Sequence, residues 1–423
     1  NSCEFLLFFV VVLAVFFSLP ARWRWLLLLL ASYGFYMAWR PVFILLIMVT
    51  TVSTYAAGRL IDRSARPWPR RGWLAACLAL NLGLLAGFKY IEFILTTICD
   101  LGALVGRPAP VPVLEAALPV GISFYTFQAL SYAIDVYRGQ RGPEPNLGRF
   151  ALYVSFFPQL VAGPIERSAD LLPQLRRPTR FEPGRVASGL QLVLWGLFKK
   201  ACVADLVAPA VKAVYSDPTA FNGTLLSAAT VLFALQIYGD FSGYSDMAVG
   251  LARILGYDLT INFRQPYFST SLAEFWRRWH MTLSQWFRDY VYIPLGGNRV
   301  GNHRWCVNIL VVFVLSGLWH GAAWHFVVWG AIHGVWLVLE HAISTVLGLD
   351  RRARRSRLLR LLRWAVTLAV VLVSWVFFVA RDMRDAVYVL THFWQLAAVR
   401  YDTVARLGLP NFHLLLLVLH LVV

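Results

Sequence analysis

Long apolar segments with few or no charged residues constrain the fold of this chain more than any other feature. The clearest lie at residues 4–20, 25–39, 41–57, 73–95 and 307–339. A helix needs roughly 20 apolar residues to cross the hydrocarbon core of a bilayer, which is about 30 Å thick. Charged residues make up 14% of the chain, whereas a soluble protein of this length carries about 25%. The sequence therefore predicts an all-α polytopic membrane protein.

The net charge of +17 comes largely from arginines in the short connections between apolar segments. Those at 20–24, 59–72 and 138–149 fall on one side of a membrane if each intervening pair of segments crosses and returns. Basic loops mark the cytoplasmic side, so we expect the N-terminus outside and lipid as a partner of these loops. Because the positive charge follows topology, we expect no nucleic-acid partner.

The chain shows no internal repeat and no low-complexity linker, so we expect a single membrane domain over residues 1–423. Further apolar segments lie near 186–208, 224–256, 361–380 and 386–398. The first residue is Asn rather than Met, and the chain ends in an apolar run. We therefore expect both termini to be incomplete.

Two hydrophobic segments differ from lipid-facing helices. Residues 118–137 carry many polar side chains, which we expect to face protein or a water-filled cavity: Ser123, Tyr125, Thr126, Gln128, Ser131, Tyr132 and Asp135. Residues 150–185 are interrupted repeatedly by proline. Non-helical backbone survives at membrane depth only where it is buried in protein or lines a cavity. We therefore predict a re-entrant or interfacial segment there.

The segment STSLAEFWRRWHMTLSQWFRDYVYIPLGGNR, residues 269–299, predicts an amphipathic helix. Ser271 and Glu274 have the spacing of a capping box. Apolar side chains then recur at helical spacing: Leu272, Phe275, Trp276, Trp279, Leu283, Trp286, Phe287 and Tyr290. The basic side chains on the opposite side are Arg277, Arg278 and Arg288. We expect this helix to lie at a membrane interface or to line the mouth of a cavity.

His320 is the first candidate reactive group. It lies in the apolar run FVLSGLWHGAAWHF, near mid-membrane if the helix begins at Cys306, because 14 residues rise about 20 Å. The segment is too long for one perpendicular helix, so we expect it to bend or open at Ser316, Gly317 and Gly321. An ionisable group at that depth needs a partner or a task. A neutral imidazole, with an ordinary pKa of about 6.5, is a competent general base.

His280 is the second candidate. It lies near the apolar face of the amphipathic helix, between Trp276 and Leu283, and is expected to point inward. The alternative is a core histidine that bonds a backbone carbonyl. On the sequence alone both interpretations stay open.

A metal site is the main rival explanation for the histidines. His325, His333 and His341 follow His320 in the same region. Five residues at about 100° each turn His325 roughly 140° away from His320, unlike the HExxH arrangement that keeps both ligands on one face. We therefore expect no metal and structural roles for His325, His333 and His341.

Two acids, Asp240 and Asp246, lie in the otherwise apolar segment LQIYGDFSGYSDMAVGLARILG, with Ser242 between them. An acid in such a segment must pair or face water. Six residues apart, they fall about 120° off each other's face, which does not support a glycosidase carboxylate pair. Polar packing against a Tyr or Arg and a functional role both stay open. The chain has no GxSxG elbow, no Walker loop and no dinucleotide GxGxxG after a strand.

The chain resembles the membrane-bound O-acyltransferase family, in its bacterial branch that includes the membrane subunit of alginate O-acetyltransferase. Five blocks in family order carry the resemblance: LPVGISFYTFQALSYAIDVYRG, FFPQLVAGPIER, YGDFSGYSDMAVGLARILG, INFRQPYFSTSLAEFWRRWHMTLSQWFRDYVYIPLGGNR and SGLWHG. It covers essentially the whole length. It implies a ring of about 10–12 transmembrane helices around a central tunnel, with re-entrant and interfacial helices.

The resemblance also implies residue roles. The histidine of SGLWHG, His320, matches the principal catalytic residue of the family, and His280 matches its second histidine. The implied substrate and tunnel candidates are Trp276, Arg277, Arg278, Trp279, Arg288, Asp240, Ser242, Asp246 and Trp319. No cofactor is implied; the donor is acetyl-CoA or another acyl thioester from the cytoplasm, whose phosphates the arginines would meet.

The implied product is an O-acetylated extracytoplasmic polysaccharide, alginate-like, made at a bacterial inner membrane. An exported or membrane-anchored partner commonly relays the acyl group in this branch. D-alanyl transfer to teichoic acid and acetyl transfer to peptidoglycan are alternatives within the class. A proton-coupled transporter is the alternative outside it, although the inverted repeats that would support it are not found.

Overall fold

A computed structural model of the chain describes residues 3–107, 118–161, 163–349, 353 and 356–395. All regular secondary structure in these ranges is helical, without a strand. The chain is therefore an all-α protein, as predicted. The apolar run at the end of the chain lies outside the described residues.

The chain divides into two compact units. The first comprises residues 1–193 and 245–260, and the second comprises residues 194–244 and 261–423. Each unit is described by itself below. This division does not test the prediction of one membrane domain over residues 1–423, which stays a prediction.

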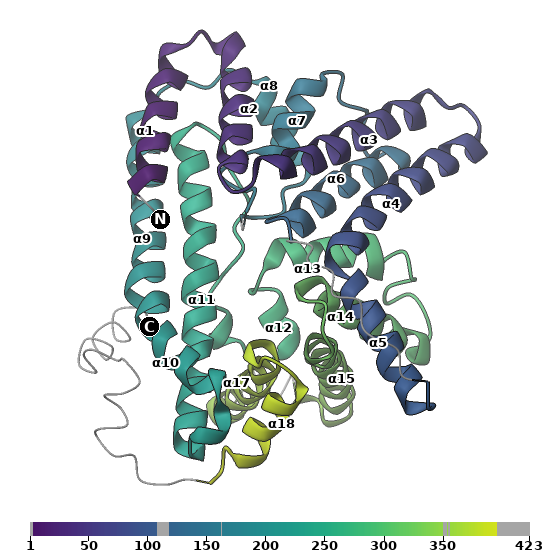
Figure 1. Cartoon of the computed structure of the whole chain (residues 1–423), viewed down its shortest axis with the longest axis vertical. Helices are drawn as coiled ribbons and strands as arrows, with labels where there is room; N and C mark the ends of the chain where they lie inside the picture. The colour runs from purple at the N-terminus through teal and green to yellow at the C-terminus, as the bar shows by residue number, and fades with distance from the viewer. Residues whose placement is uncertain (1–2, 108–117, 162, 350–352, 354–355, 396–423) are drawn as a thin grey trace. The chain divides into compact units, whose positions relative to one another are not determined.

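Eight helices lie wholly within the described part of the first unit. They are α1 (Cys3–Ser18), α2 (Ala21–Met37), α3 (Ile44–Arg63), α4 (Pro67–Lys89), α5 (Ile91–Leu104), α6 (Ile122–Tyr137), α7 (Leu147–Ser155) and α8 (Ser168–Arg176). Helices α3, α4 and α6 pack side by side (Figure 1). Gly58 allows the close approach of α3 to α6, because a Cβ there would lie 2.8 Å from Cε1 of Tyr132.

The polar side chains predicted in 118–137 are all buried in α6, so their expected protein-facing position is confirmed. Gln128 donates from Nε2 to the carbonyl of Tyr153 at 2.6 Å, and the Tyr153 hydroxyl donates back to the carbonyl of Gln128 at 3.1 Å. These paired bonds satisfy polar groups that burial would otherwise penalise by about 1–3 kcal/mol each.

The segment 150–185 contains the end of α7, a buried non-helical stretch and α8. The Tyr153 hydroxyl also lies 3.0 Å from the carbonyl oxygen of Glu166, so its one proton is shared between two acceptors. The Glu166 carboxylate accepts from the backbone N–H and the hydroxyl of Thr260. The irregular backbone is thus buried in protein, as membrane depth would require; its re-entrant or interfacial placement stays a prediction.

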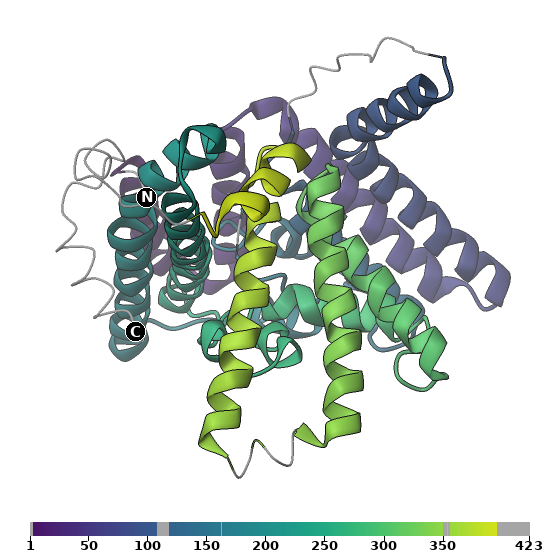
Figure 2. The same cartoon turned by 90° about the horizontal axis from the view of Figure 1, so that it is seen from below.

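The second unit contains α10 (Asp205–Ser216), α12 (Leu272–Trp276), α13 (Met281–Phe287), α14 (Asn302–His320), α15 (Trp324–Leu347), α17 (Arg357–Val379) and α18 (Met383–His392). It also has two π-helical turns, η2 (Lys199–Ala204) and η5 (Arg288–Tyr292). Helices α9 (Pro183–Phe198) and α11 (Gly223–Ile254) contribute residues to both units. Helices α15 and α17 run side by side (Figure 2).

Residues 307–339 form two helices rather than one bent helix. Helix α14 ends at His320, and α15 begins at Trp324 and packs back along α14. The expected break is confirmed at Gly321 but is wrong at Ser316 and Gly317, which lie inside α14. Gly317 instead lets the two helices touch, since a Cβ there would collide with the carbonyl oxygen of Phe326.

The predicted amphipathic helix 269–299 is wrong as one continuous element. The cap is confirmed, because the Ser271 side chain accepts from the N–H of Glu274 at 3.0 Å. The helix stops after Trp276, and a new one begins after His280, whose φ of 42° is left-handed. The amphipathic pattern survives the break: Trp276, Trp279 and Phe287 are buried, whereas Arg277 and Arg288 are exposed.

Five described helical segments are long and apolar enough to cross a membrane: Pro41–Arg63, Pro67–Lys89, Gly223–Ile254, Trp324–Leu347 and Arg357–Val379. The chain is therefore a multi-pass membrane protein. The apolar helix α1 is shorter, with 16 residues. Within the segment predicted near 386–398, the structure has the 10-residue helix α18, which is too short to cross a membrane alone. Residues 396–398 of that segment lie outside the described residues.

Candidate active site

His320 is the last residue of α14 and is partly exposed. The helix ends there because Gly321 is extended, with φ −158° and ψ 149°. The His320 ring lies against two aromatic side chains from other helices, with centroids 5.0 Å from Trp329 of α15 and 5.2 Å from Phe378 of α17. The imidazole is thus held at a helix end, where the backbone reverses.

His280 is fully buried in the left-handed turn between α12 and α13. Left-handed backbone is unfavourable for most residues, and such strain gathers at functional sites. Asn262 holds the turn: its carbonyl accepts the Met281 N–H at 3.0 Å, and its Oδ1 accepts the Thr282 N–H and hydroxyl at 3.2 and 2.7 Å. The same Oδ1 lies 3.4 Å from Nδ1 of His280. A side-chain amide oxygen therefore lies beside the buried imidazole, and both interpretations of His280 stay predictions.

The two candidate histidines share one aromatic neighbour. The Trp319 ring lies 5.8 Å from His280 and 4.9 Å from His320, centroid to centroid. Phe241 of α11 covers His280 from another side at 4.7 Å. His280 lies outside the helices long enough to cross a membrane. Burial lowers the pKa of its imidazole well below the ordinary range, and the charge of His320 lowers it further.

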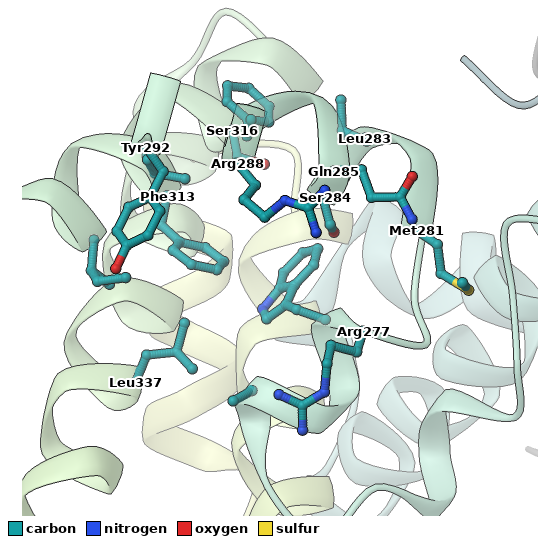
Figure 3. Close-up of a pocket in the computed structure, with 15 residues that line it drawn as sticks. Arg277, Met281, Leu283, Ser284, Gln285, Arg288, Tyr292, Phe313, Ser316 and Leu337 are labelled. Carbon is teal, nitrogen blue, oxygen red and sulfur yellow. The ribbon is translucent and has the colours of Figure 1, made fainter. Parts of the chain in front are cut away.

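A cavity of about 470 Å³ opens beside α12, α13 and α14. Its lining includes Trp276, Arg277, Met281, Leu283, Ser284, Gln285, Phe287, Arg288, Tyr292, Val312, Phe313, Ser316 and Leu337. Arg288 reaches across it toward Ser284 and Gln285, with Phe313 and Tyr292 on the other side (Figure 3). Ser316 is four residues before His320 on α14, so both face the same side of that helix. The cavity thus reaches one helical turn from His320, about 6 Å of rise.

Of the candidates on the amphipathic segment, Trp276, Arg277 and Arg288 line the cavity. Arg278 pairs with Glu274 at 2.7 Å instead. Burial raises the pKa of the Glu274 carboxyl, but hydrogen bonds from Thr270 and the charges of Arg278 and Arg277 outweigh it and hold the pKa below its usual range. Trp279 packs into the core of the second unit, stacked on Phe275 with centroids 5.5 Å apart.

The α11 candidates have other neighbours. Asp240 pairs with Lys200 of η2 at 2.6 Å, and the same ammonium pairs with Asp205 at 2.7 Å. The partner of Asp240 is therefore a lysine, rather than the Tyr or Arg of the packing interpretation. Ser242 is buried in α11, and Asp246 belongs to the first unit. Their predicted roles in substrate passage stay predictions.

The remaining histidines occupy separate places. The His325 ring nitrogen Nδ1 lies 2.8 Å from the carbonyl of Phe377, and His333 accepts a hydrogen bond from the Trp276 indole at 3.3 Å. His341 lies against Trp305. Within the described ranges, no three His, Cys, Asp or Glu side chains gather as a metal site.

Two buried polar residues of this region were not predicted as site residues. Asn262 contacts the His280 turn, and His333 contacts a wall residue of the cavity. The only sequence signal for Asn262 is one amide in the segment TINFRQP, 18 residues before His280. Such a distant partner cannot be paired from spacing.

Residues 139–381 match the profile of the membrane-bound O-acyltransferase family. This is more than half of the chain, and the chain belongs to that family: it is a membrane acyltransferase. It is 40% identical over 385 residues to an Azotobacter vinelandii protein named "Probable alginate O-acetylase AlgI", covering 90% of this chain and 74% of the relative. A Helicobacter pylori peptidoglycan O-acetyltransferase is 33% identical, covering 88% of this chain and 73% of the relative. A Streptococcus thermophilus teichoic acid D-alanyltransferase is 31% identical over 241 residues, covering 53% of this chain and 57% of the relative.

Proposed function

We propose that this acyltransferase moves an acetyl group from a cytoplasmic acyl thioester, through a tunnel, to O-acetylate an alginate-like polysaccharide outside a bacterial inner membrane. One observation carries the proposal. A cavity bearing two arginines reaches Ser316, one helical turn before His320.

The donor side of the proposal rests on the shape and charge of the cavity. A volume of about 470 Å³ falls within the roughly 300–1,000 Å³ of small-molecule sites and can hold a pantetheine arm with its acyl group. Guanidinium groups bind phosphate oxygens with charge-assisted hydrogen bonds, so Arg277 and Arg288 would meet the phosphates at the mouth. The thioester is a substrate, and the proposal needs no bound cofactor or metal.

His320 is the general base in this proposal. The acceptor hydroxyl oxygen attacks the thioester carbonyl carbon while its proton passes to a ring nitrogen of His320. The tetrahedral intermediate collapses, the C–S bond breaks, and the leaving thiolate takes the proton back from the imidazolium. His280, the second proposed catalytic residue, remains neutral and shapes the passage beyond Trp319.

The acyl group and acceptor are inferred from the relatives. The relative from Azotobacter vinelandii, whose name specifies alginate O-acetylation, is more similar over more of the chain than the D-alanyltransferase. We therefore propose acetyl as the group transferred. An exported or membrane-anchored protein would relay it to the polymer.

The test is transfer of labelled acetyl in sealed inverted vesicles, with acetyl-CoA supplied on the cytoplasmic face and the polysaccharide and relay partner present. Label appearing on partner or polymer only in vesicles that contain the protein would support the proposal. Transfer from a D-alanyl carrier protein instead would make D-alanylation the function. No transfer from either donor would contradict both proposed acyl groups.

A further inference from the structure

Trp276 is a fixed wall of the donor cavity. Its indole lines the cavity and is buried on its other sides. Four rings surround it, with centroids 5.1 Å away for His333, 5.3 Å for Phe313, 5.6 Å for Phe275 and 5.8 Å for Trp329. An indole so enclosed can turn only if its neighbours move.

One polar bond sets the orientation of that indole. Trp276 Nε1 donates to Nδ1 of His333 at 3.3 Å, across 57 residues of sequence. His333 is fully buried in α15. Because Nδ1 accepts, the ring is the neutral tautomer with its proton on Nε2. An indole N–H buried without an acceptor is unfavourable, so this bond favours one indole rotamer over the others.

Trp329 links the cavity wall to the end of α14 that bears His320, since its ring centroid lies 5.8 Å from that of Trp276. The His333 centroid is 4.8 Å from that of Trp329, whose ring in turn lies 5.0 Å from His320. A shift of the Trp276 indole would therefore change the cavity wall and disturb the Trp329 ring that lies against His320.

We infer that His333 is a positioning residue for the acyl donor, which it serves by fixing the Trp276 wall. The inference rests on the proposed function, because the ligand it positions is the acyl thioester. His333 bonds the wall residue Trp276 and does not itself line the cavity. It therefore acts on the donor through Trp276. Its loss should weaken donor binding more than it slows the chemical step.

Three variants test this with acetyl-CoA as the probe. His333→Phe keeps a ring but removes the acceptor, His333→Asn keeps an acceptor near the position of Nδ1, and His325→Phe is the control. His325 is also buried in α15 but bonds a backbone carbonyl away from the cavity lining. Because the bond that fixes the Trp276 indole is lost, we expect a KM for acetyl-CoA roughly 2- to 10-fold higher in His333→Phe, with kcat changed by less than about 2-fold. His333→Asn should give a KM between wild type and His333→Phe, and His325→Phe should keep the wild-type KM.

Trp276→Phe provides a second route if His333→Phe does not fold, as judged by gel filtration in detergent. It removes the donor of the same hydrogen bond and should raise the KM for acetyl-CoA by a similar factor. The double variant should add nothing to either single one, because both delete one interaction. An unchanged KM in the folded variants, an equal rise in His325→Phe, or no improvement in His333→Asn would overturn the inference. Absence of transfer by the wild-type protein would contradict the proposed function and the inference with it.

Discussion

At the residue scale, the left-handed turn at His280 depends on Asn262. Asn262→Ala removes the acceptor of the Thr282 N–H and hydroxyl bonds, each contributing about 0.5–1.5 kcal/mol. Because these bonds hold the turn that positions His280, we expect kcat to fall roughly 10-fold with little change in KM. Asn81→Ala is the control: Asn81 is also buried, but bonds Ser53 and Cys77 in the first unit. An equal loss of kcat in both variants would show general loosening rather than a specific role for Asn262.

His280 also predicts how stability depends on pH. Its pKa is depressed in the folded state, so the unfolded chain binds the proton more readily. The corresponding stability is fully present above the unfolded pKa of about 6.5 and is lost as pH falls below it, by up to about 1.4 kcal/mol per pH unit. We expect the melting temperature in detergent to fall less between pH 7.5 and 5.5 for His280→Asn than for wild type. Asn tolerates the left-handed backbone and does not titrate. Parallel curves would contradict this account.

At the element scale, the α14–α15 hairpin presents His320. The helices meet at two glycines: a Cβ on Gly317 would collide with the carbonyl of Phe326, and a Cβ on Gly330 with that of Phe313. Gly330→Ala should therefore destabilise the protein by about 1–3 kcal/mol, the usual range for overpacking, and reduce transfer. The matched control is Gly83→Ala in α4, where a Cβ would meet nothing within 4 Å and helix propensity favours Ala. Thermal unfolding in detergent should give a lower melting temperature for Gly330→Ala than for Gly83→Ala. Equal melting temperatures would contradict the close-contact explanation.

At the scale of the whole molecule, the arginine-bearing loops predict topology. Arg66, between α3 and α4, is exposed, and we expect it on the cytoplasmic side. In a cysteine-free background, Arg66→Cys should react with a membrane-impermeant maleimide in inverted vesicles and not in intact spheroplasts. The opposite pattern would reverse the orientation and place the arginine-bearing loops outside.

Much of this molecule follows from local sequence patterns. The helices arise from apolar runs, the Ser271 cap from its spacing, and the burial of α6 from its many polar side chains, which lipid would not tolerate. The break at His280 could not be predicted, since the helical period continues through it and the residue that stabilises the turn lies 18 positions earlier. The Trp276–His333 bond joins residues 57 positions apart. Spacing alone cannot reveal such tertiary pairs.

His320 is the proposed base of acyl transfer. The most direct test compares labelled acetyl transfer by wild type, His320→Ala and His325→Ala at matched expression in sealed inverted vesicles. General base catalysis contributes typically 10²–10⁴-fold, so we predict a loss of about that size in His320→Ala. His325→Ala, once corrected for folded protein, should transfer within a few-fold of wild type. Equal transfer by wild type and His320→Ala would contradict the claim and leave His320 with a structural role.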